Sequence, residues 1–212
     1  MTISIDPEVV EQVRRIFKLL EHQVTLNLFL TSESKCPHCK EAEEIVNLIS
    51  RISPKVNIKK YYEGSEEAKK YNIDKYPAII VHGKEEYNVR YFGVPAGYEF
   101  GVLVEDILYA SRGRPDLPEN IIERVRRISK PVHIQVFTTP TCPYCPYVAK
   151  VAHMFAIANN HIVSDVINAV EFPELVEKFR VYAVPKVIIN SKVAFEGSLT
   201  EEEFLRRIEE AL

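Results

Sequence analysis

The chain has 212 residues, of which 46% are apolar, and a formal net charge of −3. Such a length accommodates one large domain or two of ordinary size, and the small charge gives no general reason to expect nucleic acid or an acidic membrane as a partner. The sequence contains no apolar run of the roughly 18 residues that cross a bilayer, and its start lacks the basic and apolar segments of a secretory signal. We therefore expect a cytoplasmic protein.

The first half opens with a predicted helix. Asp6 followed by Pro7 is typical of a helix start, and apolar residues then recur at helical spacing. A β-rich run over 24–30 leads into the motif Cys36-Pro37-His38-Cys39, which is followed by a second amphipathic stretch. An apolar strand after Pro77, a turn, another strand and a helix over about 97–111 complete this half.

The second half repeats this order. The segment "PENIIERVRRI", which begins at Pro118, echoes "PEVVEQVRRI", which begins at Pro7. A β-rich run over 132–137 precedes the motif Cys142-Pro143-Tyr144-Cys145, and a matching proline precedes a later strand. Two copies about a hundred residues apart indicate a domain duplication. We place the boundary in the Pro-, Gly- and charge-rich segment 111–120, which gives modules over 1–115 and 116–212.

Each half predicts a mixed α/β fold with the order α-β-α-β-α-β-β-α. A strand-helix-strand opening implies a parallel pair with a right-handed crossover, and the last two strands imply an antiparallel hairpin. A mixed central sheet flanked by helices follows for each module. In this arrangement each C-x-x-C motif falls between a strand and the start of a helix.

All four cysteines lie in the two C-x-x-C pairs. In a reducing compartment such pairs are more often catalytic or metal-binding than structural. A helix start stabilises an anion, so Cys36 and Cys142 are the predicted nucleophiles. Cys39 and Cys145 follow one turn later and are placed to resolve a mixed disulfide. The neighbouring Pro37 and Pro143 suit a helix start because their missing N–H is not needed there.

The pairs Tyr76-Pro77 and Val184-Pro185 stand at matched distances after the two motifs. A proline directly before an apolar strand is tolerated only at an edge or at the first strand residue. Because cis peptide bonds are mostly proline bonds, the repetition of this proline beside two C-x-x-C pairs predicts a cis bond at each position.

Three segments carry a family resemblance: "VRYFGVPAGYEF" (89–100), "TPTCPYCPYVAK" (139–150) and "NAVEFPELVEKFRVYAVPKVII" (168–189). They resemble the thioredoxin and glutaredoxin superfamily, and more closely the two-module protein disulfide oxidoreductases, or glutaredoxin-like proteins, of thermophilic archaea and bacteria. The likeness covers essentially the whole chain. It implies two tandem thioredoxin-like folds and an enzyme that oxidises, reduces and isomerises protein disulfides.

The resemblance also assigns roles to matched residues. It implies redox-active disulfides at Cys36–Cys39 and Cys142–Cys145, cis-prolines at Pro77 and Pro185, and substrate-binding backbone groups at Tyr76 and Val184. The expected partners are proteins with thiols or disulfides and a flavoprotein similar to thioredoxin reductase, and no metal or organic cofactor is required for this cycle.

Two departures from the superfamily pattern stand out. Thioredoxins carry a buried acid on the strand before the motif, whereas these strands offer Asn27 and Gln135. The proton acceptor for the resolving cysteines is therefore left unassigned. The segment "FEGSLTEEE" also lacks the Gly-Gly pair of glutathione-using glutaredoxins, so glutathione is not expected as the dedicated partner.

The two motifs differ at one position, where His38 in the first corresponds to Tyr144 in the second. A partly cationic imidazole stabilises a neighbouring thiolate and hence the reduced form, so we expect the first pair to be the better oxidant. Pro37, His38, Pro143 and Tyr144 are thus predicted to modulate the two pairs.

The sequence leaves three alternatives open. The first is an electron shuttle between a flavoprotein reductase and a peroxidase or other reductase. The second is a zinc-binding interaction module, because four thiolates can bind zinc, although a complete module separates the pairs. Permanent crosslinks are less favoured, since closing so short a loop removes little entropy from the unfolded chain.

Overall fold

The computed structural model describes residues 6–212, the side chains of 193 and 194 excepted; residues 1–5 of the first predicted module lie outside the described residues. The helices are α1 (Pro7–Phe17), α2 (Cys39–Ile52), α3 (Glu66–Lys70), α4 (Tyr98–Arg112), α5 (Glu119–Arg126), α6 (Cys145–Ala158), α7 (Pro173–Lys178) and α8 (Glu201–Glu210). The strands are β1 (Val24–Leu30), β2 (Val56–Tyr62), β3 (Ala78–His82), β4 (Val89–Phe92), β5 (Val132–Thr138), β6 (Ile162–Asn168), β7 (Lys186–Ile189) and β8 (Lys192–Glu196). This order confirms the predicted elements of both halves.

Local signals explain where several helices begin. The Asp6 side chain accepts a hydrogen bond from the N–H of Glu8 at 2.8 Å, so the predicted cap of α1 is confirmed. Thr200 and Glu203 form a reciprocal capping box at the start of α8. Each cap satisfies backbone donors that the first helical turn leaves without a partner.

The strands of the described residues form one eight-stranded sheet, in the order β2-β1-β3-β4-β6-β5-β7-β8. Within each half the parallel crossover pair and the antiparallel hairpin are confirmed. The parallel pairing of β4 with β6 was not predicted, and it joins the two four-stranded halves edge to edge. Two tandem thioredoxin-like folds therefore share one continuous sheet.

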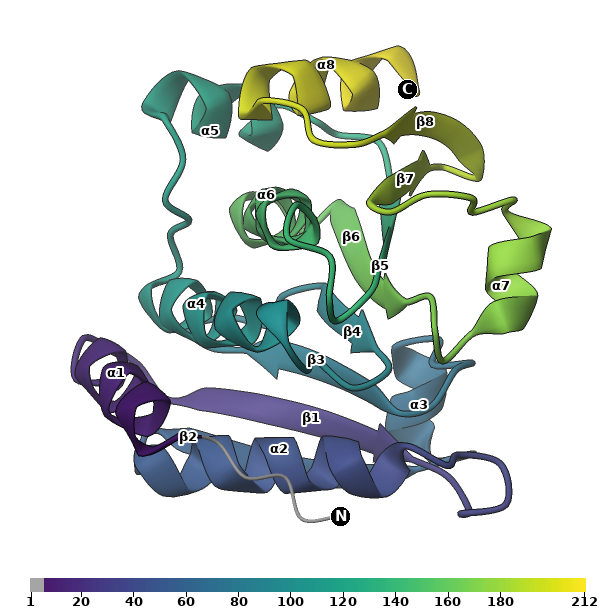
Figure 1. Cartoon of the computed structure of the whole chain (residues 1–212). Coiled ribbons are helices and arrows are strands. Elements are labelled where there is room, and N and C mark those ends of the chain that lie inside the picture. The colour runs from purple at the N-terminus through teal and green to yellow at the C-terminus, as the bar shows by residue number, and fades with distance from the viewer. Residues whose placement is uncertain (1–5) are drawn as a thin grey trace.

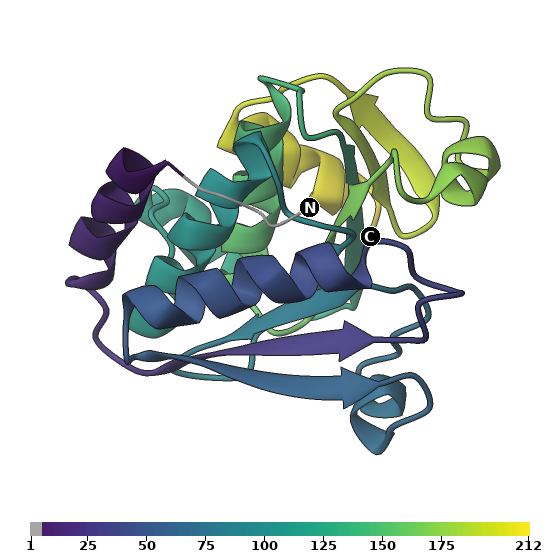
Figure 2. The same ribbon diagram turned by 60° about the horizontal axis from the view of Figure 1, so that its bottom comes forward.

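Helices cover both faces of this sheet. A large core packs α1, α2, α4, α5, α6 and α8 on one face, where Figure 1 shows α4 and α6 side by side at the junction of the halves. Figure 2 shows α2 lying along β1 and β2. A smaller core, rich in phenylalanine, lies under α3 and α7 on the opposite face. Because the larger core runs through both halves, packing as well as strand pairing holds them together.

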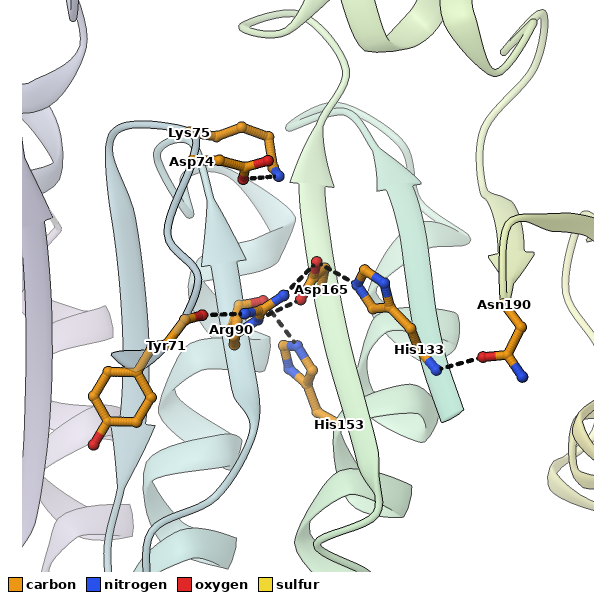
Figure 3. A network of polar contacts seen from close by, with 8 residues as sticks. All are labelled: Tyr71, Asp74, Lys75, Arg90, His133, His153, Asp165 and Asn190. Carbon is orange, nitrogen blue, oxygen red and sulfur yellow. Dashed lines mark hydrogen bonds and ion pairs between the residues drawn. The ribbon is translucent and has the colours of Figure 1, made fainter. Parts of the chain in front are cut away.

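A polar network crosses the junction between β4 and β6 (Figure 3). Arg90 and Asp165 are register partners, and their side chains form two contacts of 2.6 and 2.9 Å. The Nε2 atom of His133 lies 2.7 Å from the same carboxylate. Burial alone would raise the pKa of Asp165, but the Arg90 and His133 interactions outweigh burial and lower it to about 2. This buried charge pair fixes the register in which the halves join.

Residues 113–118 connect α4 to α5. The module boundary between residues 115 and 116 falls in this connection and remains a prediction, because the sheet and the larger core continue across both halves. Within the described part of the chain, no helix is long and apolar enough to cross a membrane.

Candidate active sites

Both C-x-x-C motifs lie at the same end of the sheet, where strands β1 and β5 end. Strand β1 is antiparallel to β3, β3 is antiparallel to β4, and β4 and β5 are both parallel to β6, so β1 and β5 run in the same direction. Each motif follows the carboxyl end of its strand. Cys36 is bonded to Cys39 and Cys142 to Cys145, with Cα–Cα distances of 5.4 and 5.5 Å. The fold thus places two disulfides of the same type on one side of the molecule.

The helices begin slightly later than the motif suggests. Helix α2 starts at Cys39 and α6 at Cys145, with His38 and Tyr144 at the N-cap positions. Pro37 and Pro143 therefore lie in the turn before the helix and not in its first turn, which Pro146 occupies in α6. Each helix therefore begins at the second cysteine of its motif and not at the first.

The helix N-terminus faces sulfur most directly at the second site. There the N–H of Cys145 points to Cys142 Sγ at 3.1 Å. At the first site the N–H of Cys39 donates to the Cys36 carbonyl oxygen at 3.4 Å instead. A backbone donor at the positive end of a helix stabilises a thiolate, so this contact favours Cys142 as a nucleophile.

The cysteines also differ in exposure. Cys142 is 8% exposed and Cys145 is fully buried, which suits a nucleophile followed by a resolving thiol. At the first site the order is reversed, because Cys36 is 2% exposed and Cys39 is 7% exposed. The assignment of nucleophile and resolving roles remains a prediction at both sites, and its geometric support is stronger at the second.

A cis peptide bond precedes each of the matched prolines, Tyr76-Pro77 and Val184-Pro185. The carbonyl oxygen of Val184 lies 3.8 Å from Cys142 Sγ, so this loop borders the second disulfide directly. Each proline precedes the first strand of an antiparallel hairpin, and a glycine, Gly93 or Gly197, follows the second strand. The N–H of that glycine donates a 2.9 Å hydrogen bond to the proline carbonyl. The backbone around each cis bond is thereby held beside a C-x-x-C pair, where an extended peptide could pair with it.

The residues between the cysteines lie at the surface. The His38 side chain is 45% exposed, and its Nδ1 atom lies 3.8 Å from Glu41 Oε2. Tyr144 is 68% exposed. Both side chains can therefore meet an incoming partner, and only the imidazole can add a positive charge.

Two hollows of different character flank the motifs. A cleft of about 540 Å³ adjoins the first site and is lined by Pro37, His38, Tyr76 and several charged side chains. A groove of about 520 Å³ adjoins the second site at Pro143 and is mostly apolar, with Tyr98, Phe100 and Tyr147 among its walls. Each hollow contains residues from both halves of the chain, so neither site is built by one module alone.

The structure reveals a buried carboxyl that was not predicted from the sequence. Asn27 and Gln135 occupy buried strand positions as expected, but Glu99, in the first turn of α4, is only 2% exposed. Its carboxyl is hydrogen-bonded to the hydroxyl of Thr138 at the end of β5, and the adjacent N–H of Tyr98 donates to Pro140 at 3.2 Å. Burial raises the pKa of Glu99 to about 7. The first half thus supplies a carboxyl beneath the loop that leads to Cys142.

A second carboxyl, Glu171, borders the first site. It lies between β6 and α7 and lines the same cleft as Pro37 and His38. Burial raises its pKa above the usual value, with opposing contributions from hydrogen bonds and from His38. The sequence signal was weak at both positions, because Glu99 resembles an ordinary helix-start acid and Glu171 a turn acid.

The zinc alternative requires a cluster of ligands around one point. Within residues 6–212 no group of three or more His, Cys, Asp or Glu side chains is placed to hold a metal ion. The four cysteines are instead divided between two separate disulfides. The described site therefore has the form of paired dithiols and not of a shared thiolate cluster.

Two C-x-x-C disulfides at helix starts, on a thioredoxin-like sheet, form an arrangement typical of thiol–disulfide oxidoreductases. The thioredoxin domain family matches residues 132–210. A protein disulfide oxidoreductase from Aeropyrum pernix K1 has 29% sequence identity and a TM-score of 0.90, with 99% of this chain and 94% of that chain covered. These comparisons support a thioredoxin/glutaredoxin-type fold for the chain, and residues 132–210 match the thioredoxin domain itself.

Curated relatives are similar to this chain over part of their length. The alkyl hydroperoxide reductase AhpF of Staphylococcus aureus is 27% identical over 93% of this chain, and a Bacillus subtilis NADH dehydrogenase is 25% identical over 96%. The chain spans only 36% and 38% of their lengths. The N-terminal domain of AhpF from Enterococcus faecalis has a TM-score of 0.89 at 22% identity, with 97% of this chain and 100% of that domain covered, and supports the fold.

Proposed function

We propose that the chain transfers electron pairs between its own dithiols and the disulfides or dithiols of other proteins, through Cys36/Cys39 and Cys142/Cys145. The observation that carries this proposal is the arrangement of two disulfides at the same end of the sheet, each beside a cis-proline loop. A partly exposed backbone segment beside a disulfide suits an extended polypeptide better than a small thiol. The Aeropyrum pernix protein, named a protein disulfide oxidoreductase, supports the same substrate class.

The proposed reaction at the second site consists of two successive thiolate attacks. In the reducing direction the thiolate of Cys142 attacks a substrate disulfide, which forms a mixed disulfide and releases one substrate thiolate. Cys145 then loses its proton and attacks Cys142 Sγ, which closes the internal disulfide and releases the second substrate thiolate. Two electrons pass to the substrate, and two protons end on its thiols. Oxidation of a substrate dithiol is the same sequence in reverse.

Glu99 is the proposed proton acceptor for Cys145. Its carboxyl is buried beneath the end of β5, next to the loop that carries the motif. A carboxyl with a pKa of about 7 can both take and return a proton at neutral pH, which is the property that acid–base catalysis needs. This role replaces the strand acid that Asn27 and Gln135 do not provide.

Electron supply is the second part of the proposal. The relatives named alkyl hydroperoxide reductase and NADH dehydrogenase match nearly the whole chain within a longer protein. This similarity favours a flavoprotein disulfide reductase as the electron donor, with a peroxidase or another disulfide protein as acceptor. A cytoplasmic setting belongs to the same proposal, because reversible dithiols there are catalytic more often than structural.

Paired serine substitutions test the assignment. We expect Cys36→Ser/Cys39→Ser and Cys142→Ser/Cys145→Ser each to retain part of the activity in insulin reduction and in reactivation of scrambled ribonuclease, and the fourfold variant to fall to the uncatalysed rate. Full activity in the fourfold variant would refute the proposal. Adding a purified flavoprotein disulfide reductase with NADH or NADPH, and a thiol peroxidase as acceptor, tests the shuttle role with the same variants.

A further inference from the structure

Glu171 reaches from the second half of the chain into the first site. It follows β6, and because β6 pairs in parallel with β4, its loop lies against the loop that follows β4. The Oε1 atom of Glu171 accepts hydrogen bonds from the N–H of Val94 at 2.8 Å and from the side-chain amide of Asn168 at 2.7 Å. The carboxyl is therefore held across the junction by fixed donors.

Gly93 links the Glu171 carboxyl to the cis-proline loop of the first site. Gly93, next to Val94, donates its N–H to the carbonyl of cis-Pro77 at 2.9 Å. Its φ is +95°, and a Cβ atom there would lie 3.0 Å from Glu171 Oε1 and 2.7 Å from Asn168 Cβ. Only a glycine thus fits between the Glu171 carboxyl and the cis-proline loop.

The second carboxylate oxygen of Glu171 is buried and, within the described residues, has no hydrogen-bond partner. Buried polar atoms are nearly always paired, so an unpaired carboxylate oxygen is a candidate for a functional proton site. Glu171 lines the cleft that Pro37 and His38 also line. The free oxygen therefore belongs to a side chain that borders the first C-x-x-C pair.

We propose that Glu171 is the proton acceptor of the first site, where it takes up, by way of His38, the proton that Cys39 releases when it attacks the mixed disulfide on Cys36. This inference rests on the proposed function. The Cys39 S–H bond breaks, the new S–S bond to Cys36 forms, and the substrate sulfur leaves with its electron pair. The carboxyl then returns the proton to that leaving thiolate.

Several properties of the cleft fit this role. Burial raises the pKa of the Glu171 carboxyl above its ordinary value, which makes it a better proton acceptor than an exposed glutamate. The charges that act on the Glu171 carboxyl belong to His38 and Glu41, in the turn and helix that hold the cysteines, and Glu171 in turn acts on Glu99 of α4. The other charged side chains of the cleft are Lys35, Glu63, Asp74, Lys75 and Glu174.

A two-phase thiol assay isolates the proposed step. In a Cys142→Ser/Cys145→Ser background, the reduced protein reacts with one equivalent of Ellman's reagent in a stopped-flow instrument. The first thionitrobenzoate release reports attack by Cys36, and the second reports attack by Cys39 on the Cys36 mixed disulfide. A parent protein that releases no thionitrobenzoate contradicts the proposed function itself, independently of Glu171.

Glu171→Gln keeps a side-chain oxygen for Val94 and Asn168 but cannot take up a proton. We expect its second phase at pH 7 to be slower by about a hundredfold, the lower end of a general base contribution, with the first phase unchanged. The difference should narrow above the ordinary thiol pKa of about 8.5, where Cys39 ionises without help. Glu174→Gln, a matched control on the same cleft, should leave both phases unchanged.

The outcomes are decisive in either direction. An unchanged second phase in Glu171→Gln overturns the proposal, as does equal slowing of both phases or the same slowing in Glu174→Gln. Glu171→Asp retains a carboxylate and should recover most of the second-phase rate; a rate as low as that of Glu171→Gln contradicts the proton role. Thermal melting of each variant shows whether the fold is retained.

Discussion

Replacement of Glu99 by Gln measures how much the buried carboxylate lowers the free energy of unfolding. Burial raises the pKa of Glu99 from 4.5 to about 7. The folded protein therefore binds one more proton than the unfolded chain between these values, and its stability falls as the pH rises through this window. At about 1.36 kcal/mol per pH unit the loss above pH 7 amounts to about 3 kcal/mol.

The assay is guanidinium unfolding of the oxidised protein at pH 4 and pH 8. Gln cannot ionise and keeps an acceptor for the Thr138 hydroxyl, so the variant does not lose stability as the pH rises. We expect equal free energies of unfolding at pH 4 and a variant that is more stable by about 3 kcal/mol at pH 8. Glu105→Gln, a partly exposed position on the same helix, is the control and should show no such change.

A stability difference that does not vary with pH would refute the reasoning, as would a variant less stable than the parent at pH 8. The first result would mean that the carboxyl is not neutralised by burial, and the second that the Gln amide loses more contacts than the charge costs. A gain in stability should also accompany slower turnover at the second site, because a carboxyl that destabilises the fold is expected where activity needs it.

The remaining predictions concern the junction and the turn between the cysteines. Asp165→Asn leaves the Arg90 guanidinium partly buried without its charge partner and should cost about 3–5 kcal/mol in denaturant unfolding at pH 7. Because the Asp165 pKa falls from 3.8 to about 2, the parent loses this advantage as the pH falls through that range, so a cost equal at pH 2 and pH 7 contradicts the ion pair. His38→Tyr should lower the reduction potential of the first pair and Tyr144→His should raise that of the second, by roughly 30 mV per 1.4 kcal/mol of thiolate stabilisation. Equilibration of single-site proteins with a glutathione redox buffer measures both, and unchanged or reversed potentials exclude the role of the imidazole.

The sequence was sufficient for the elements and their order. Helix periodicity, the Asp6 cap and the strand runs before each motif are local signals, and the repeat supplied each of them twice. The pairing of β4 with β6 has no such local signal, because any exposed edge strand offers the same backbone donors and acceptors. The opposite charges of Arg90 on β4 and Asp165 on β6 are the one sequence feature on these described strands that matches the observed pairing.

The cysteines and their prolines were equally accessible from the sequence, since their chemistry depends on short spacing. The carboxyls were not. Whether Glu99 is a solvated helix-start residue or a buried acid is decided by Thr138, 39 residues later, and Glu171 is placed by Val94, 77 residues earlier. Burial by a distant segment leaves no periodic pattern in the sequence. The two proposed proton acceptors could therefore be identified only from the folded structure.

These two carboxyls cross the junction in opposite directions. Glu99 comes from the first half and lies beneath the second motif, whereas Glu171 comes from the second half and borders the first motif. If both act as proton acceptors, each half of the duplicated chain completes the site of the other. The parallel pairing of β4 with β6 then has a chemical consequence: a shift in that register would displace both acids from their cysteines at once, without altering either C-x-x-C turn.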